Sequence, residues 1–366
     1  MKKKELQCVE AALLESTMTY FDTLNTKDIA VGRERGAVLK IKDIESLVKE
    51  IAVSDEVHFY IEVLRGGPEV RMTKVGKRLL MNMWAREEVE RYYPIHDFTP
   101  YVKAFFECVH EYASAYYSFR KLQRDPTEMM ESLNSVIERI RSAVRGSAFK
   151  ANINMHRRLS NKNYKSLLTY IDAIFEGCSR VLVLRVDLGY SKSIVHRDFR
   201  EGLQFETVKT QREKLLKLLR RKLPSKTLLG HAWKLEFGLS KGFHYHCMFF
   251  LDGSKVREDV SWARTVGELW ERATEGQGVY YNCNRTKSNY RACGIGMVEH
   301  SDREKRKNLQ KAAIYLTKIE YYMRIATEGR ARTFGRGEMP KRVVKKRGRP
   351  RRLPLPPPSV TVEASI

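Results

Sequence analysis

The sequence lacks several features that mark particular classes of protein. No stretch of about 18 residues is free of charged side chains, so no membrane-spanning helix is expected. The six cysteines are scattered without a Cys-x-x-Cys spacing, and several lie in apolar surroundings, which predicts reduced thiols in the core of a cytosolic protein. The first residues, MKKKELQCVE, are basic but acquire glutamates before any apolar run, so no signal peptide is expected.

Acidic side chains are too few to balance the basic ones. The 366 residues contain 68 Lys plus Arg against 44 Asp plus Glu, a formal net charge of +24. Residues 1–150 hold 24 basic and 23 acidic side chains, and residues 151–366 hold the other 44 and 21, so the net charges are +1 and +23. This charge predicts a polyanionic partner, with the second part of the chain as the nucleic-acid surface. The alternative is a basic protein whose charge serves only solubility.

The chain is expected to divide into three parts. Residues 1–150 show apolar side chains at helical spacing and predict a mainly helical accessory domain, apart from a strand-like piece at 56–70. The tract at 147–165 breaks this periodicity and marks a boundary. A second domain is expected at 160–335, followed by a basic, Pro-rich and unstructured tail at 336–366.

The second domain shows an informative order of elements. Its patterns predict helices at 163–178, 205–223, 257–274 and 303–326, and strands at 180–190, 227–238, 243–251, 278–283 and 294–300. The predicted fold class is therefore α+β. It has a central antiparallel sheet in the βαββαβ order of ferredoxin-like and RRM-like folds, followed by one more helix.

Two histidines, His244 and His246, flank Tyr245 in the strand GFHYHCMFFLDG. Side chains at i and i+2 face the same side of a strand, so both imidazoles can converge on one metal ion. Glu236, on the preceding strand, is expected diagonally across from both, and Asp187 is the second candidate for the third ligand. Two imidazoles and a carboxylate suit Mg²⁺ or Mn²⁺ when a phosphate supplies further oxygens. The alternative is a pair of core histidines with structural hydrogen bonds.

A tyrosine and a lysine share one face of the last predicted helix. Tyr315 and Lys318 are three residues apart, which places a phenol beside an ammonium group. A neighbouring cation and a metal-bound phosphate would both favour attack by the phenol oxygen. Tyr321 and Tyr322 are expected to be packing aromatics. Arg324 makes Tyr321 the stronger rival to Tyr315, because a guanidinium can also hold a phosphate.

The stretches KLEFGLSKGFHYHCMFF and AIYLTK resemble the motifs of the His-hydrophobic-His (HUH) endonucleases. Within them, the chain is similar to the rolling-circle replication initiators of the inovirus gene-II-like group, found in filamentous phages and bacterial prophages. The resemblance covers about residues 160–335. It implies an HUH endonuclease domain there, with metal binding by His244 and His246, nucleophilic attack by Tyr315 and support of the phosphate by Lys318.

The activity that this resemblance implies is nicking of one DNA strand at an origin. Tyr315 would attack the scissile phosphate at the metal site, form a 5′-phosphotyrosine and release a 3′-hydroxyl that primes a host polymerase. The expected partners are single-stranded or origin DNA, a host polymerase and a host helicase, in the cytoplasm of a bacterial cell and away from membranes. Two alternatives stay open: a DNA-binding regulator that does not cleave, and a relaxase or transposase that acts on other DNA.

A basic segment follows the predicted second domain. Residues 330–352 carry eleven Lys and Arg against one Glu, and the PLPPP run after them argues against a folded continuation. The RGRP stretch resembles the core of an AT-hook, whose arginines enter the narrow minor groove of A·T-rich DNA. An unstructured tail that binds any phosphate backbone is the alternative. The DNA-binding candidates in this segment are Lys345, Lys346, Arg347 and Arg349.

Removing residues 340–366 is expected to weaken DNA binding and to flatten its salt dependence. Each lost phosphate contact lowers the slope of log K against log salt by about one. Nicking should survive the truncation. Binding of one oligonucleotide by the full-length and truncated proteins, measured over a series of salt concentrations, gives both slopes. Equal slopes would contradict a DNA-binding role for the tail.

Overall fold

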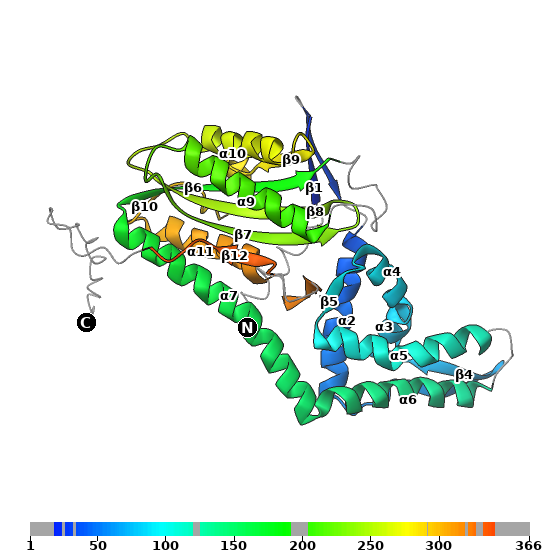
Figure 1. Ribbon diagram of the computed structural model, residues 1–366. Helices are drawn as coiled ribbons and strands as arrows, with labels where there is room; N and C mark the ends of the chain where they lie inside the picture. Colours follow the sequence, from blue (N-terminus) through cyan, green and yellow to red (C-terminus); the bar gives the residue numbers. More distant parts are fainter. Residues whose placement is uncertain are drawn as a thin grey trace, which may run out of the picture.

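The structure, a computed structural model, describes residues 18–23, 26–31, 34–119, 125–191, 204–290, 292–318, 321–326 and 332–340. It is a mixed α/β structure whose strands all pair antiparallel, which confirms the expected class with a central antiparallel sheet. Within these ranges, every helix is too short or too polar to cross a membrane. Figure 1 shows the N-terminal helices on one side and the main sheet with its helices on the other, with one long helix running between them.

The N-terminal part is mainly helical. Its elements are β1 (Met18–Thr23), β2 (Thr26–Val31), α2 (Arg35–Val53), β3 (Phe59–Leu64), β4 (Gly67–Met72), α3 (Lys74–Asn82), α4 (Ala85–Tyr92), β5 (His96–Phe98), α5 (Pro100–Phe119) and α6 (Pro126–Arg145). The strand-like piece at 56–70 belongs to the antiparallel pair of β3 and β4. Apolar faces of α2, α5 and α6 meet in one core, in which Ile41, Phe105 and Ile137 are buried.

Helix α7 (Ser147–Gly177) corrects one expectation. The tract at 147–165, predicted to break the helical pattern, lies inside this single helix of 31 residues. No proline or glycine interrupts the tract, and His156 anchors its middle, with Nε2 buried 2.8 Å from the carbonyl oxygen of Tyr321. A tertiary contact of this kind stabilises a helix whose own apolar periodicity is weak. The division of the chain near residue 150 stays a prediction.

The central sheet forms from segments that are far apart in the sequence. The elements that follow α7 are β6 (Arg180–Tyr190), α9 (Phe205–Lys222), β7 (Leu228–Gly238), β8 (Gly242–Asp252), α10 (Asp259–Ala273), β9 (Gly278–Asn282), β10 (Gly296–Glu299), α11 (Arg303–Lys318), β11 (Met323–Ile325) and β12 (Phe334–Arg336). The strand order is β10-β6-β8-β7-β12. Strand β9 pairs with the second half of β6 and β10 with its first half, so the two short strands together take one position at that edge.

Different helices cover the two faces of this sheet (Figure 1). Along β8, Tyr245 and Cys247 pack into the core beneath α9 and α10, whereas Met248 packs into the core beneath α7 and α11. His244 and His246 share the face of Met248, because side chains alternate along a strand. Both histidines therefore point toward the side of the sheet that α11 covers.

The last helix is shorter than the sequence predicts. Helix α11 is described to Lys318, and residues 323–325 form strand β11 where a helix to residue 326 was expected. Strand β11 pairs antiparallel with β5, with Met323 opposite Phe98 and Ile325 opposite His96. Pairing with a distant strand overrides the local helical pattern, because strand formation depends strongly on its neighbours.

Gly294 sets how closely the segment between β9 and β10 approaches α11. A Cβ at this position would lie 2.3 Å from the backbone nitrogen of Leu309 and 2.5 Å from its Cα. Gly294→Ala is therefore expected to lower the free energy of unfolding by about 1–3 kcal/mol, because helix backbone cannot move aside cheaply. The matched control is Gly146→Ala, where nothing lies within 4 Å of the new Cβ. Urea denaturation measures both variants, and equal stabilities would contradict this close approach.

Candidate metal and nucleophile site

Three predicted metal ligands come together on the face of the sheet that α11 covers. Glu236, His244 and His246 each offer one ligand atom, and these atoms lie within 4.8 Å of one another. The Oε2 atom of Glu236 is 3.6 Å from Nε2 of His244 and 3.3 Å from Nε2 of His246. The register of β7 and β8 places Glu236 directly opposite His244, which corrects the expected diagonal position. Lys234 is the residue opposite His246.

His244 is held in the tautomer that a metal ligand requires. Its Nδ1 lies 3.0 Å from the carbonyl oxygen of Gly242. A carbonyl oxygen can only accept a hydrogen bond, so Nδ1 carries the proton and Nε2 keeps its lone pair toward Glu236. Burial lowers the pKa of His244 and favours this neutral form. A backbone carbonyl on the outer nitrogen is a frequent arrangement around metal-binding histidines.

His246 is held by a carboxylate on its outer nitrogen. Asp187, on β6, lies directly opposite His246, and its Oδ1 is 2.8 Å from Nδ1 of the imidazole. Burial alone would lower the pKa of His246, but Asp187 and Glu236 raise it to about 9. Burial would raise the pKa of Asp187, but His246 and Arg185 lower it to about 2. Asp187 thus orients the ring from outside the three-residue cluster.

The cluster has the donor set of a divalent cation site. The Nε2 atoms of both histidines and Oε1 of Glu236 are buried and make no hydrogen bond within the described chain. Buried polar atoms without partners are costly and call for a ligand. Two imidazole nitrogens and one carboxylate fit a cation such as Mn²⁺, and they fit Mg²⁺ when further oxygens complete the coordination. The three residues therefore could hold a divalent cation.

Tyr315 lies against this cluster. Its ring is perpendicular to that of His246, with the ring centroids 5.5 Å apart. The Cζ atom of Arg185 lies 4.1 Å from the Tyr315 ring centroid, a cation–π distance, and its Nε is 3.8 Å from Oδ1 of Asp187. The side chains of Tyr315, Arg185, Asp187 and His246 thus form a continuous chain of contacts that ends at Glu236.

Sequence reasoning missed Arg185. Its position carried a signal, because Arg185 and Asp187 are alternate residues in the otherwise apolar run RVLVLRVDLGY. Two charges on one face of a buried strand need partners on the same face. The positive charge of Arg185 is retained despite burial, because Asp187 raises its pKa.

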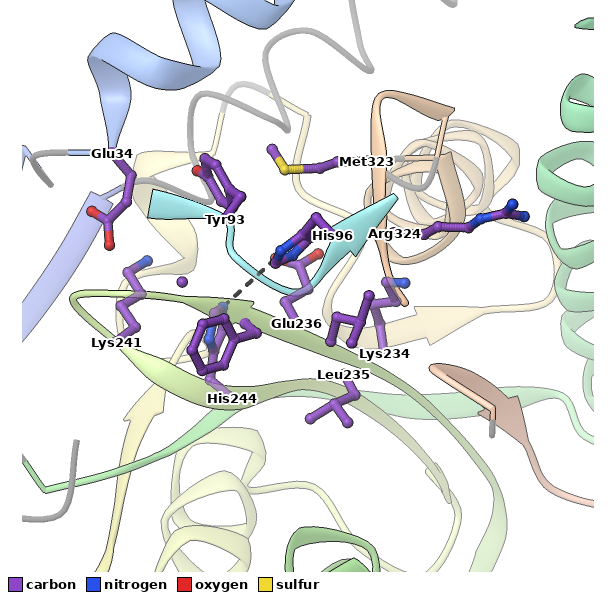
Figure 2. A pocket seen from close by; sticks show the side chains of 13 residues that line it. Glu34, Tyr93, His96, Lys234, Leu235, Glu236, Lys241, His244, Met323 and Arg324 are labelled. Carbon is purple, nitrogen blue, oxygen red and sulfur yellow. Dashed lines mark ion pairs between the residues drawn. The ribbon is translucent and has the colours of Figure 1, made fainter. Parts of the chain in front are cut away.

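A small pocket of about 40 Å³ opens beside Glu236 and His244. Figure 2 shows Tyr93 and His96 on its other side, both from the N-terminal part of the chain. Burial lowers the pKa of His96 to about 3, so this imidazole is neutral. Sequence reasoning missed it, since nothing in the local pattern around His96 links it to a strand some 140 residues away.

The other predicted residues have different outcomes. Tyr321 and Tyr322 are buried in the N-terminal core, and the Tyr321 hydroxyl donates a hydrogen bond of 2.8 Å to Oε1 of Glu45. This favours packing roles for both, as the sequence predicts. Lys318 lies at the end of α11, and its side chain is outside the described part of the structure. The tail candidates Lys345, Lys346, Arg347 and Arg349 also lie outside the described residues.

Comparison with known proteins gives one match. No curated protein and no solved structure matches the chain. The family model of the YagK/YfjJ C-terminal domain matches residues 144–337, a span that contains the cluster, Asp187, Arg185 and Tyr315. This span is more than half of the sequence, and the chain therefore belongs to the YagK/YfjJ C-terminal domain family.

Proposed function

We propose that this protein is a metal-dependent DNA nickase of the HUH type, which opens one strand at an origin to start rolling-circle replication. One observation carries the proposal: Tyr315 lies against His246 of the cluster formed with His244 and Glu236. A phenol beside a divalent-cation site on a rigid sheet is the arrangement that attack on a phosphodiester requires.

The proposed reaction is a transesterification. The Tyr315 oxygen attacks phosphorus, the bond from phosphorus to the 3′ oxygen breaks, and a 5′-phosphotyrosine forms. The phenol gives up its proton and the leaving 3′ oxygen takes one, so no water is consumed and the strand can be rejoined later. A cation held by Glu236, His244 and His246 would offset charge on the phosphate. Lys318, one helical turn after Tyr315, is the proposed second cation at the phosphate.

Two further observations support the proposal. The chain order β6-α9-β7-β8-α10-β9/β10 is a βαββαβ order, in which the first and third strands pair at the centre of the sheet. This agrees with the HUH topology that the sequence motifs imply. The net charge of +23 on residues 151–366 suits a nucleic-acid substrate. Host polymerase and helicase in a bacterial cytoplasm are the proposed partners.

A second candidate is a DNA-binding protein that does not cleave. One observation favours it: the Tyr315 side chain is only 8 % exposed and packs within the apolar core of the N-terminal part. A nucleophile must reach its phosphate, so this candidate requires that Tyr315 stays covered when DNA binds. Relaxases and transposases would share the chemistry of the nickase and differ in the DNA they act on.

Tyr315→Phe is expected to abolish the covalent adduct with DNA. The substitution removes the attacking oxygen and keeps the ring that packs on Arg185 and His246. Tyr322→Phe is the matched control and should form the adduct at the wild-type level. The protein is incubated with labelled single-stranded DNA from its own genetic neighbourhood and Mn²⁺, and the modified peptide is located by mass spectrometry. An adduct on Tyr321 or Tyr322 would move the nucleophile, and the absence of any adduct would favour the second candidate.

Removing a cluster ligand is expected to weaken Mn²⁺ binding more than removing Asp187. His244→Ala and Glu236→Gln each delete one ligand. Asp187→Asn changes only the group that orients His246, and a loss of this kind lowers metal affinity by about 10–100-fold. Asp172→Asn, on exposed α7 surface, is the control. Mn²⁺ titration calorimetry gives all the affinities. A larger loss for Asp187→Asn than for Glu236→Gln would show that the third ligand is Asp187.

A further inference from the structure

Residues from outside the matched family span form one wall of the pocket beside the cluster. His96 is fixed there by strand β5, where it pairs with Ile325 of β11. Its backbone N–H donates a hydrogen bond of 3.2 Å to the carbonyl oxygen of Tyr93. The imidazole packs edge-on against the Tyr93 ring, with centroids 5.0 Å apart, and against Phe237 of β7 at 6.3 Å. These contacts hold the ring in one place.

His96 presents a polar atom that no described residue satisfies. Its Nδ1 is buried and has no hydrogen-bond partner within the described ranges. His96 and Glu236 both line the pocket (Figure 2). Lys234 and Lys241 line the same pocket, together with the carboxylates of Glu34 and Glu236. Arg324 also lines it, but its guanidinium is paired with Asp97. The imidazole and the two lysines are the groups of this lining that can donate hydrogen bonds to a phosphate group.

The size of the pocket restricts what can enter. Its volume is about 40 Å³. One water needs about 10–15 Å³ on this scale, so the pocket admits a few waters or one phosphate-sized group but not a nucleobase. The lining includes Glu236 and His244 but neither His246 nor Tyr315. The pocket therefore lies on the side of the cluster away from the candidate nucleophile.

We propose that this pocket is a phosphate subsite, in which His96 binds the DNA phosphate next to the one that Tyr315 attacks. The inference rests on the proposed function, which identifies the ligand as a DNA strand. It assigns a role to the N-terminal part of the chain. This part supplies the pocket residues that hold the DNA strand beside the cluster. The subsite contacts a phosphate and no base. It therefore contributes to affinity and positioning, and not to recognition of the DNA sequence.

The test measures how the full-length protein, with Mn²⁺, binds fluorescein-labelled tetrathymidylate. His96→Phe keeps a ring against Tyr93 and Phe237 and removes both nitrogens, so affinity should fall about fivefold, the value of one neutral hydrogen bond. His96→Asn places an amide near the position of Nδ1 and should restore the affinity to within about twofold. His110→Phe, on the exposed side of α5, is the control. Mn²⁺ affinity should be the same in all of these proteins.

Two results would overturn the inference. One is wild-type affinity for tetrathymidylate in His96→Phe, and the other is loss of Mn²⁺ affinity in that variant, which would make His96 a metal ligand. If His96→Phe fails to fold, Lys241→Gln serves instead, with an expected loss of about threefold. A wild-type protein that binds the probe but forms no adduct would refute the nickase and leave the subsite intact. A protein that nicks while both variants bind normally would refute the subsite alone.

Discussion

The charge balance on one face of the central sheet is the constraint on which the rest of the site depends. Glu236 and Asp187 are carboxylates whose side chains are only 12 % and 17 % exposed, and His246 and Arg185 are the cations that compensate them. Removing one member of such a set typically costs about 3–5 kcal/mol, because the remaining charge is left without a partner. A slip of one residue in β6, β7 or β8 would turn these side chains to opposite faces. The ion pairs and the strand register therefore support each other.

The same charges explain why the cluster suits a divalent cation. Without one, the proton on His246 offsets the charge of Glu236. A metal ligand must be deprotonated, so a cation bound at Nε2 would take the place of that proton. Asp187 lies at Nδ1, on the other side of the ring, and would keep the ring oriented in either state. Arg185, which carries its charge permanently, balances Asp187 and also makes a cation–π contact with the ring of Tyr315.

The sequence predicted the parts of the site that depend on local periodicity. Alternation along β8 placed His244 and His246 on one face, and hairpin pairing brought Glu236 to them. The expected diagonal position of Glu236 was wrong, since Glu236 lies directly opposite His244. The turn after Gly238 sets this register, and the sequence does not determine the geometry of that turn. His96 and the true end of α11 escaped prediction for one reason. Both depend on the pairing of β5 with β11, a contact between segments more than 200 residues apart.

The N-terminal part of the chain positions the site from outside the matched family span. Glu34 accepts a hydrogen bond of 2.6 Å from the backbone N–H of Ser240, and Leu239 N–H donates to the carbonyl oxygen of Tyr92, so residues before 144 hold the turn between β7 and β8. Tyr315 packs in the N-terminal core, whereas its neighbour Leu316 packs in the core of the sheet. The span at 144–337 contains every cluster residue. The exposure of these residues and one side of the pocket, lined by Tyr93 and His96, depend on the first part of the chain. The exposure of Tyr315 is therefore governed by how the N-terminal core packs on α11.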